Sequence, residues 1–122
     1  MPNLPVSNPS QFIQGAPVLQ VPDVAATATF YRDVLGFTWD FSSDDYAVVW
    51  RDNSAIHLAK GDGRPTGVHL FQWVQDVDAY YAEIVSRGAD VKTTPEDRSY
   101  GIRDFSLRDV NGLVVVFGHD ID

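Results

Sequence analysis

Cysteine is absent from the sequence, and basic residues are scarce. Without cysteine the chain has no disulfide, no thiolate nucleophile and no cysteine-bound zinc or iron–sulfur site. The 9 Lys and Arg residues face 17 Asp and Glu residues, which gives a net charge of −8. Nucleic-acid binding needs a basic face, so we do not expect a nucleic-acid partner. An acidic chain favours neutral or cationic small ligands.

A long apolar run is also missing, since no stretch approaches the roughly 20 residues that span a bilayer. Residues 1–15 are polar and contain proline. They have neither a basic start nor an apolar core, so we expect no signal peptide, no membrane contact and a cytoplasmic location. The 122 residues, 44% of them hydrophobic and 12% aromatic, suffice for one folded domain.

The clearest feature that is present is an internal repeat. Residues 18–37 and 69–89 share a pattern: an apolar strand, a Val-x-Asp step, a helix with one apolar stripe and then glycine. Short segments of alternating polarity follow each copy. We therefore predict an α+β fold of two βαβββ modules, which bury their sheets together. The expected divisions are an arm at 1–15 and a single domain at 16–122, with module one at about 16–59, a linker at 60–66 and module two at about 67–118.

Caps, periodicity and turns predict the helices and strands. Asp23 and Asp76 are good N-caps because a carboxylate accepts the free amides of a first helical turn. The pairs at 52–53 and 111–112 (Asp-Asn and Asn-Gly) favour hairpin turns. We expect helices at 24–35 and 77–87, strands at 16–21, 37–41, 46–51, 55–59, 69–74, 89–91, 104–108 and 113–117, and a loop at 92–101.

Strand parity predicts which side chains share a face, because successive residues point to opposite sides of a sheet. A turn at 52–53 places Val48 opposite His57. A four-residue turn at 42–45 places Phe41 opposite Tyr46. We call the face that carries His57 the front; the opposite face is apolar and suited to a covering helix. The expected front holds Phe37, Trp39, Phe41, Tyr46, Val48, Trp50 and His57 in module one, and His69, Phe71, Trp73, Arg103, Phe105, Leu107, Val114 and Val116 in module two.

An aromatic front with a few polar groups has the composition of a ligand cavity. It could instead form a second core or a dimer interface. A dry core would make His57, His69 and Gln20 costly, which favours the cavity. Catalytic signatures are missing: there is no Gly-x-Ser-x-Gly segment, and the aspartates fall on caps and turns. Metal-free general acid–base chemistry by His57 or His69 stays open.

The repeat together with VPDV…FYRDVLGF, YGIRDF at 100–105 and LRDVNGL at 107–113 resembles the vicinal oxygen chelate superfamily. That family includes glyoxalase I, extradiol dioxygenases, fosfomycin-modifying enzymes and bleomycin-resistance proteins. The resemblance runs from Ala16 to about Gly118 and implies paired βαβββ modules that form a cupped mixed sheet.

The metal enzymes of that family carry ligands at four inward positions, and the resemblance places these on Ala16, His57, His69 and Val116. Alanine and valine cannot bind a metal, and even an open zinc site uses three protein ligands. We therefore expect no cofactor; if a divalent metal binds, His57 and His69 are its ligands. A glyoxalase-like lyase or isomerase with an incomplete metal site is the alternative, and a regulatory module with a vestigial cavity is a third.

The resemblance is nearer to the bleomycin-resistance proteins, which are metal-free, acidic dimers. It implies a non-enzymatic homodimer that binds a planar aromatic ligand, neutral or cationic, and sequesters an antibiotic or toxic compound. Stacking on tryptophan and attraction of a cation to an acidic surface need no catalysis. The residues expected at the ligand are Trp39, Trp50 and Trp73 as platforms, Tyr46, Phe41 and Phe105 as walls, His57, His69, Gln20 and Arg103 as orienting groups, and Tyr100 at the rim.

Overall fold

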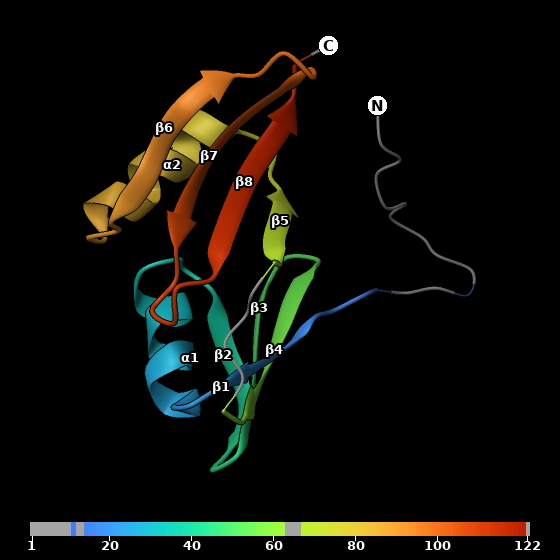
Figure 1. Ribbon diagram of the computed structural model, residues 1–122, viewed down its shortest axis with the longest axis vertical. Coiled ribbons are helices and arrows are strands. Elements are labelled where there is room, and N and C mark those ends of the chain that lie inside the picture. The colour runs from blue at the N-terminus through green and yellow to red at the C-terminus, as the bar shows by residue number, and fades with distance from the viewer. Residues whose placement is uncertain (1–10, 12–13, 63–66, 122) are drawn as a thin grey trace.

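The structure is a computed structural model that describes residues 11, 14–62 and 67–121. Most of the expected arm and part of the linker fall outside the described residues. Within the described chain, two modules of the same element order are stacked one above the other (Figure 1).

Each module forms a four-stranded mixed sheet with one helix. The strand orders are β1-β4-β3-β2 and β5-β8-β7-β6, with one parallel and two antiparallel pairings in each sheet. The predicted α+β fold of two βαβββ modules is confirmed. The elements are β1 (Val18–Val21), α1 (Val24–Asp33), β2 (Thr38–Ser43), β3 (Tyr46–Arg51), β4 (Ser54–Lys60), β5 (His69–Trp73), α2 (Val77–Ser86), β6 (Val91–Asp97), β7 (Ile102–Arg108) and β8 (Val114–Asp120).

Both helices start at the predicted caps. Asp23 accepts the Ala26 amide at 2.9 Å and Asp76 accepts the Ala79 amide at 3.1 Å. Each helix is followed by a glycine with positive φ, 77° at Gly36 and 89° at Gly88, a conformation that costs glycine nothing. No helix in the described part of the chain is long and apolar enough to cross a membrane.

Strand β6 differs from the prediction. Residues 92–97 continue the strand that was expected to end at 91 and to lead into a loop. The strand lies at the edge of its sheet, where Pro95 needs no ladder partner, and its pairing with β7 is irregular. Lys92, Pro95, Glu96 and Asp97 are residue types that are depleted in strands, which explains why the sequence predicts a loop here.

One hydrophobic core serves both modules, and it lies between the sheets and the helices. Its largest members come from both halves, with Tyr31 and Leu35 at α1 and Ile84 at α2. The aromatic rings of Phe105 and Phe117 stack at 5.4 Å and are fully buried. The faces of the sheets turned away from the helices therefore receive no cover from this core.

Polar contacts tie the two modules together around that core. The Tyr31 hydroxyl donates to Asp109 at 2.8 Å, and the Tyr80 hydroxyl donates to the Leu35 carbonyl at 2.7 Å. Burial raises the pKa of Tyr31 well above its usual value, and the Asp109 carboxylate adds to the rise. Arg51 forms a two-armed ion pair with Glu83 at 2.7 and 3.0 Å.

Replacing Tyr31 with phenylalanine should lower the free energy of unfolding by about 1–3 kcal/mol, because it leaves a buried Asp109 oxygen without its donor. Urea unfolding followed by circular dichroism measures this. The matched control is Tyr81→Phe, whose hydroxyl has no hydrogen-bond partner among the described residues and whose removal should cost at most about 0.5 kcal/mol. Equal losses in the two variants would contradict the role given to the Tyr31 hydroxyl.

Candidate functional site

In module one the front face has the predicted register. Val48 lies opposite His57 and Trp50 lies opposite Ala55. On the opposite face of these strands Ala47, Val49, Ile56 and Leu58 are fully buried under α1. On the front, Val48 and His57 are half-buried and Trp50 is 39% exposed. A large indole left open on a sheet face offers a flat stacking surface.

The polar groups of this front lie on the same face as that indole. The Tyr46 hydroxyl is 2.6 Å from His57 Nδ1, and the two rings meet edge to face. In the parallel pairing Val18 lies opposite His57 and Gln20 lies opposite Ala59, which places both β1 residues on the front. Val18 is 55% exposed and the Gln20 side chain is also exposed. His57, Tyr46, Gln20 and Trp50 thus share one face as predicted, with His57 between Trp50 at one end of the strands and Tyr46 and Gln20 at the other.

In module two the front is carried by β5 and β8. Phe71 lies opposite Val116 and Trp73 opposite Gly118, and the rings of Phe71 and Trp73 are 4.8 Å apart. A Cβ atom on residue 118 would lie 2.7 Å from Phe71 Cζ, so the glycine makes room for that ring. Phe71 is still 37% exposed. His69, at the start of β5, is exposed on the same face.

A buried carboxylate lies next to this aromatic pair and was not expected. Asp104 is 7% exposed and accepts hydrogen bonds from Arg98 Nε at 2.8 Å and from the Tyr100 hydroxyl at 2.9 Å. The hydrogen bond to Asp104 raises the pKa of Tyr100 and that of Arg98. Tyr100, expected at the rim, is 63% exposed there. The motif at 100–105 holds this cluster, but its sequence does not reveal which face Asp104 takes.

The first correction concerns strand β2. The turn at its end has two residues, not four, so Ser43 lies opposite Tyr46 and Phe41 opposite Val48. A bulge between Trp39 and Phe41 then places Trp39 opposite Val49, on the helix side. There Arg32 lies 5.5 Å from the centre of the Trp39 ring. Phe37 is buried in the core. Trp39 and Phe37 therefore do not belong to the front.

The second correction concerns the last hairpin. Its connection has five residues, 109–113, closed by the Asp109 amide on the Leu113 carbonyl at 2.8 Å. Phe105 therefore lies opposite Phe117 in the core, and Leu107 opposite Val115. Arg103 points to α2, where it pairs with Asp78 at 2.9 Å. The sequence predicts a two-residue turn at 111–112, and the observed connection is longer by an odd number of residues. Because side chains alternate between the two faces of a strand, this difference moves each residue of β7 to the face opposite to the predicted one. Phe105 and Arg103 are not part of the front.

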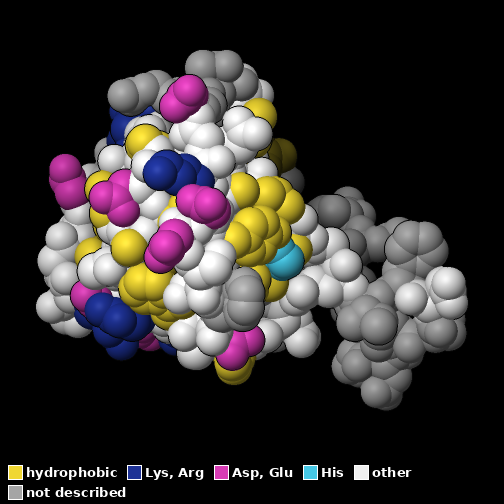
Figure 2. All heavy atoms as spheres, turned by 90° about the horizontal axis from the view of Figure 1, so that it is seen from below, with side chains coloured by type: hydrophobic (Ala, Val, Ile, Leu, Met, Phe, Trp, Pro, Cys, Tyr) yellow, Lys and Arg dark blue, Asp and Glu magenta, His cyan; other side chains and the backbone are white. Residues whose placement is uncertain are grey.

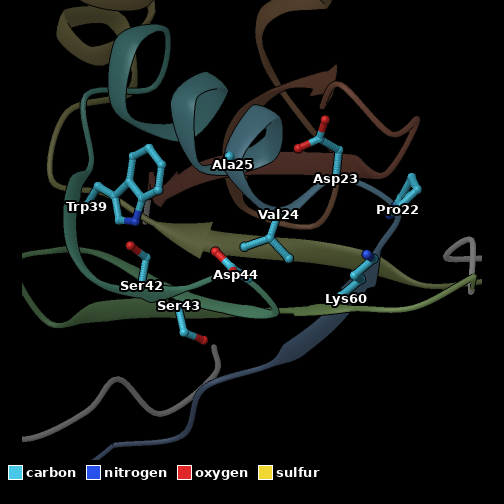
Figure 3. Close-up of a pocket in the computed structure, with 9 residues that line it drawn as sticks. All are labelled: Pro22, Asp23, Val24, Ala25, Trp39, Ser42, Ser43, Asp44 and Lys60. Atoms are coloured by element: carbon cyan, nitrogen blue, oxygen red, sulfur yellow. The ribbon is translucent and has the colours of Figure 1, made fainter.

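A cavity of about 560 Å³ lies on the helix side of module one (Figure 3). The start of α1, the end of β2 and Lys60 line it, together with Trp39. Figure 3 shows the indole nitrogen of Trp39 directed towards Ser42. Among the described side chains this nitrogen is the one buried polar atom without a hydrogen-bond partner. Trp39 thus belongs to this cavity and not to the aromatic front.

The donor set on the front does not fit a metal ion. Within the residues that the structure describes, no three His, Asp or Glu side chains are grouped closely enough to hold one. His57 contacts a tyrosine hydroxyl, and Ala16 and Val116 offer no donor. His119 serves another purpose: its Nδ1 accepts the Val77 amide at 2.9 Å and so caps the first turn of α2.

Hydrophobic side chains form a patch beside a histidine on one face of the molecule (Figure 2). Over the rest of that face, acidic, basic and further hydrophobic side chains are mixed. Most of the arginines are paired with carboxylates, for example Arg98 with Glu96 and Arg103 with Asp97.

Comparison with known proteins identifies relatives at the level of family and fold. Residues 13–117 match the model of the Glyoxalase/Bleomycin resistance protein/Dioxygenase superfamily. No curated protein sequence matches the chain significantly. Structural similarity is broad, with 170 matching chains.

Three solved structures illustrate this similarity. A glyoxalase/bleomycin resistance protein/dioxygenase from Alicyclobacillus acidocaldarius has a TM-score of 0.81 at 18% identity, with 96% of each chain covered. The bleomycin-binding protein of bleomycin-producing Streptomyces verticillus, complexed with copper(II)-bleomycin, has a TM-score of 0.74 at 28% identity, with 88% of this chain and 95% of that chain covered. A bleomycin-binding protein complexed with bleomycin has a TM-score of 0.76 at 20% identity, with 88% and 98% covered.

Proposed function

The chain belongs to the Glyoxalase/Bleomycin resistance protein/Dioxygenase superfamily, and we propose that it is a metal-independent small-molecule-binding protein within it. Its ligand is a planar aromatic compound, neutral or cationic, such as an antibiotic or toxic molecule that the protein sequesters. The ligand lies on the aromatic front, with Trp50 and Trp73 as stacking platforms and His57 and Gln20 as orienting groups.

The uncovered aromatic front is the observation that carries this proposal. The front keeps Trp50, Phe71 and Trp73 accessible or half-accessible, whereas the helix side of the sheets is lined by fully buried residues such as Val49 on β3 and Phe117 on β8. Exposed aromatic side chains beside a few polar groups characterise binding surfaces. The 28% identical protein from Streptomyces verticillus, which was crystallised with copper(II)-bleomycin, supports a ligand of this chemical class.

Metal independence and a homodimer are parts of the proposal. By resemblance to the metal enzymes of the family, two of the four ligand positions fall on Ala16 and Val116, so the front offers two imidazoles where a catalytic zinc site uses at least three protein ligands. Each sheet presents an open front with exposed apolar residues such as Val18 and Phe71. A second copy of the chain would cover both fronts and enclose the ligand between them. We do not assign an enzymatic reaction.

Ligand binding can be tested by thermal unfolding with a panel of planar cationic antibiotics that includes metal-free bleomycin. A ligand that binds the folded state only raises the midpoint by mass action. Trp50→Leu should weaken the affinity about tenfold, because it removes a stacking surface. Val85→Ala, on the outer side of α2, is the control and should leave the ligand affinity unchanged. A folded protein that responds to no member of the panel would contradict the proposal.

Metal independence predicts that Zn²⁺, Ni²⁺ or Mn²⁺ leaves the unfolding midpoint unchanged, because no complete ligand set stabilises the folded state. Elemental analysis of the purified protein should find less than one metal ion per chain. If a metal binds with one ion per chain and binding is lost in both His57→Gln and His69→Gln, the glyoxalase-like lyase or isomerase becomes the better assignment.

A homodimer predicts a sedimentation mass of twice the 13.5 kDa chain. Val18→Asp puts a charge on the front and should weaken the dimer at least about tenfold, because a charge is costly to bury unpaired. Val85→Asp adds the same charge to a valine that is 44% exposed on α2, and it should have no effect on the mass. A monomeric wild-type protein at all concentrations would refute this part of the proposal.

A further inference from the structure

We propose that Tyr46 holds His57 in one tautomer, with the proton on Nε2, and that this N–H selects ligands with a hydrogen-bond acceptor at the edge of a flat ring. The inference rests on the proposed function, because it specifies the ligand class for the same front. It makes Tyr46 a positioning residue and His57 the group that contacts the ligand.

The geometry leaves one ring nitrogen of His57 free. The Tyr46 hydroxyl is 2.6 Å from Nδ1, whereas Nε2 has no partner among the described residues. The two side chains come from neighbouring antiparallel strands, and their rings are perpendicular within a few degrees, at 85°. Each strand is anchored by fully buried residues on its other face, such as Val49 on β3 and Leu58 on β4. The contact is therefore held by the sheet.

The chemistry of the two groups favours Tyr46 as the donor. In a neutral imidazole one nitrogen donates and the other accepts, and a phenol can do both. Each direction of this hydrogen bond leaves one proton and one lone pair without a partner in the described chain, so the number of unsatisfied groups is the same for both. A phenolic O–H is a strong donor, whereas the phenolic oxygen is a weak acceptor and the unprotonated nitrogen of imidazole is a strong one. The hydrogen bond from the Tyr46 hydroxyl to Nδ1 is therefore the stronger of the two, and it leaves the proton on Nε2.

His57 lies next to a stacking surface on the same face of the sheet. Trp50 is a diagonal neighbour of His57, since Trp50 pairs with Ala55 on the strand that carries the histidine. A flat ring stacked on Trp50 can thus present its edge to His57, and an acceptor there completes the hydrogen bond. A protonated Nε2 has no lone pair for a metal ion, so the same pair disfavours metal binding at His57. His69 has no hydrogen-bond partner among the described side chains, so the two histidines are not equivalent.

The tautomer can be measured without any ligand. Long-range ¹H–¹⁵N correlation spectra of the full ¹⁵N-labelled chain, at a pH where imidazoles are neutral, distinguish Nε2–H from Nδ1–H. Loss of a signal in His57→Gln assigns His57. We expect the Nε2–H pattern in the wild type and a mixture in Tyr46→Phe. Tyr100→Phe removes a hydroxyl that donates to Asp104, and it should change nothing at His57. A wild-type Nδ1–H tautomer, or an even mixture, overturns the proposal.

The selection of an acceptor can be measured with two probes, the hydroxymethyl derivatives of quinoline and of naphthalene, which differ in one ring nitrogen. Titration followed by indole N–H shifts should show about threefold to tenfold tighter binding of the quinoline compound, the value of one hydrogen bond. His57→Phe should abolish this preference and keep the stacking. Equal binding to the wild type overturns the selecting role. If neither compound binds, both the proposed function and the selecting role of His57 are refuted. The tautomer spectrum then still tests whether Tyr46 fixes the tautomer of His57.

Discussion

A single hydrophobic core on one side of both sheets is the constraint on which the rest of the structure depends. Tyr31 and Leu35 from module one and Ile84 and Phe105 from module two are buried in the same cluster. Successive side chains of a strand point to opposite faces, so the residues that fill the core also determine which residues point to the other face. That other side keeps Trp50, Phe71 and Trp73 in reach of solvent. The candidate site thus consists of the side chains on the sheet faces that point away from the core.

The sequence predicted most of the architecture, since the repeat, the caps at Asp23 and Asp76 and the alternating strands are local signals. The register at Val48 and His57 followed because the turn at 52–53 has the assumed length. Trp39, Arg103 and Phe105 were misplaced, because the bulge in β2 and the five-residue connection at 109–113 shift parity by one residue. Such shifts depend on contacts distant in sequence, among them the acceptance of the Tyr31 hydroxyl by Asp109, which no local pattern records.

The two modules share a topology but differ in the chemistry of their fronts. Module one presents an indole beside a hydrogen-bonded Tyr46–His57 pair, and the residue paired with His57 on β3, Val48, is uncharged. Module two presents the Phe71–Trp73 pair beside a carboxylate neutralised by Arg98. A duplicated fold therefore supplies two different half-sites. Family membership assigns the scaffold, whereas the function depends on how these side chains are used.

The Asp109–Leu113 connection has a consequence for how such a scaffold can change over time. Asp109 receives the Tyr31 hydroxyl and two amides of its own loop, so its carboxylate holds the length of the connection constant. With that length held, Val114 and Val116 on the open side can be exchanged while Phe105, Leu107 and Val115 stay in place, whereas Ser106 is held by a hydrogen bond to Thr93 at 3.0 Å. Point substitutions can therefore vary the open face without changing the core on which folding depends. One inserted residue would instead turn the open-face side chains into the core and the core side chains to the open face.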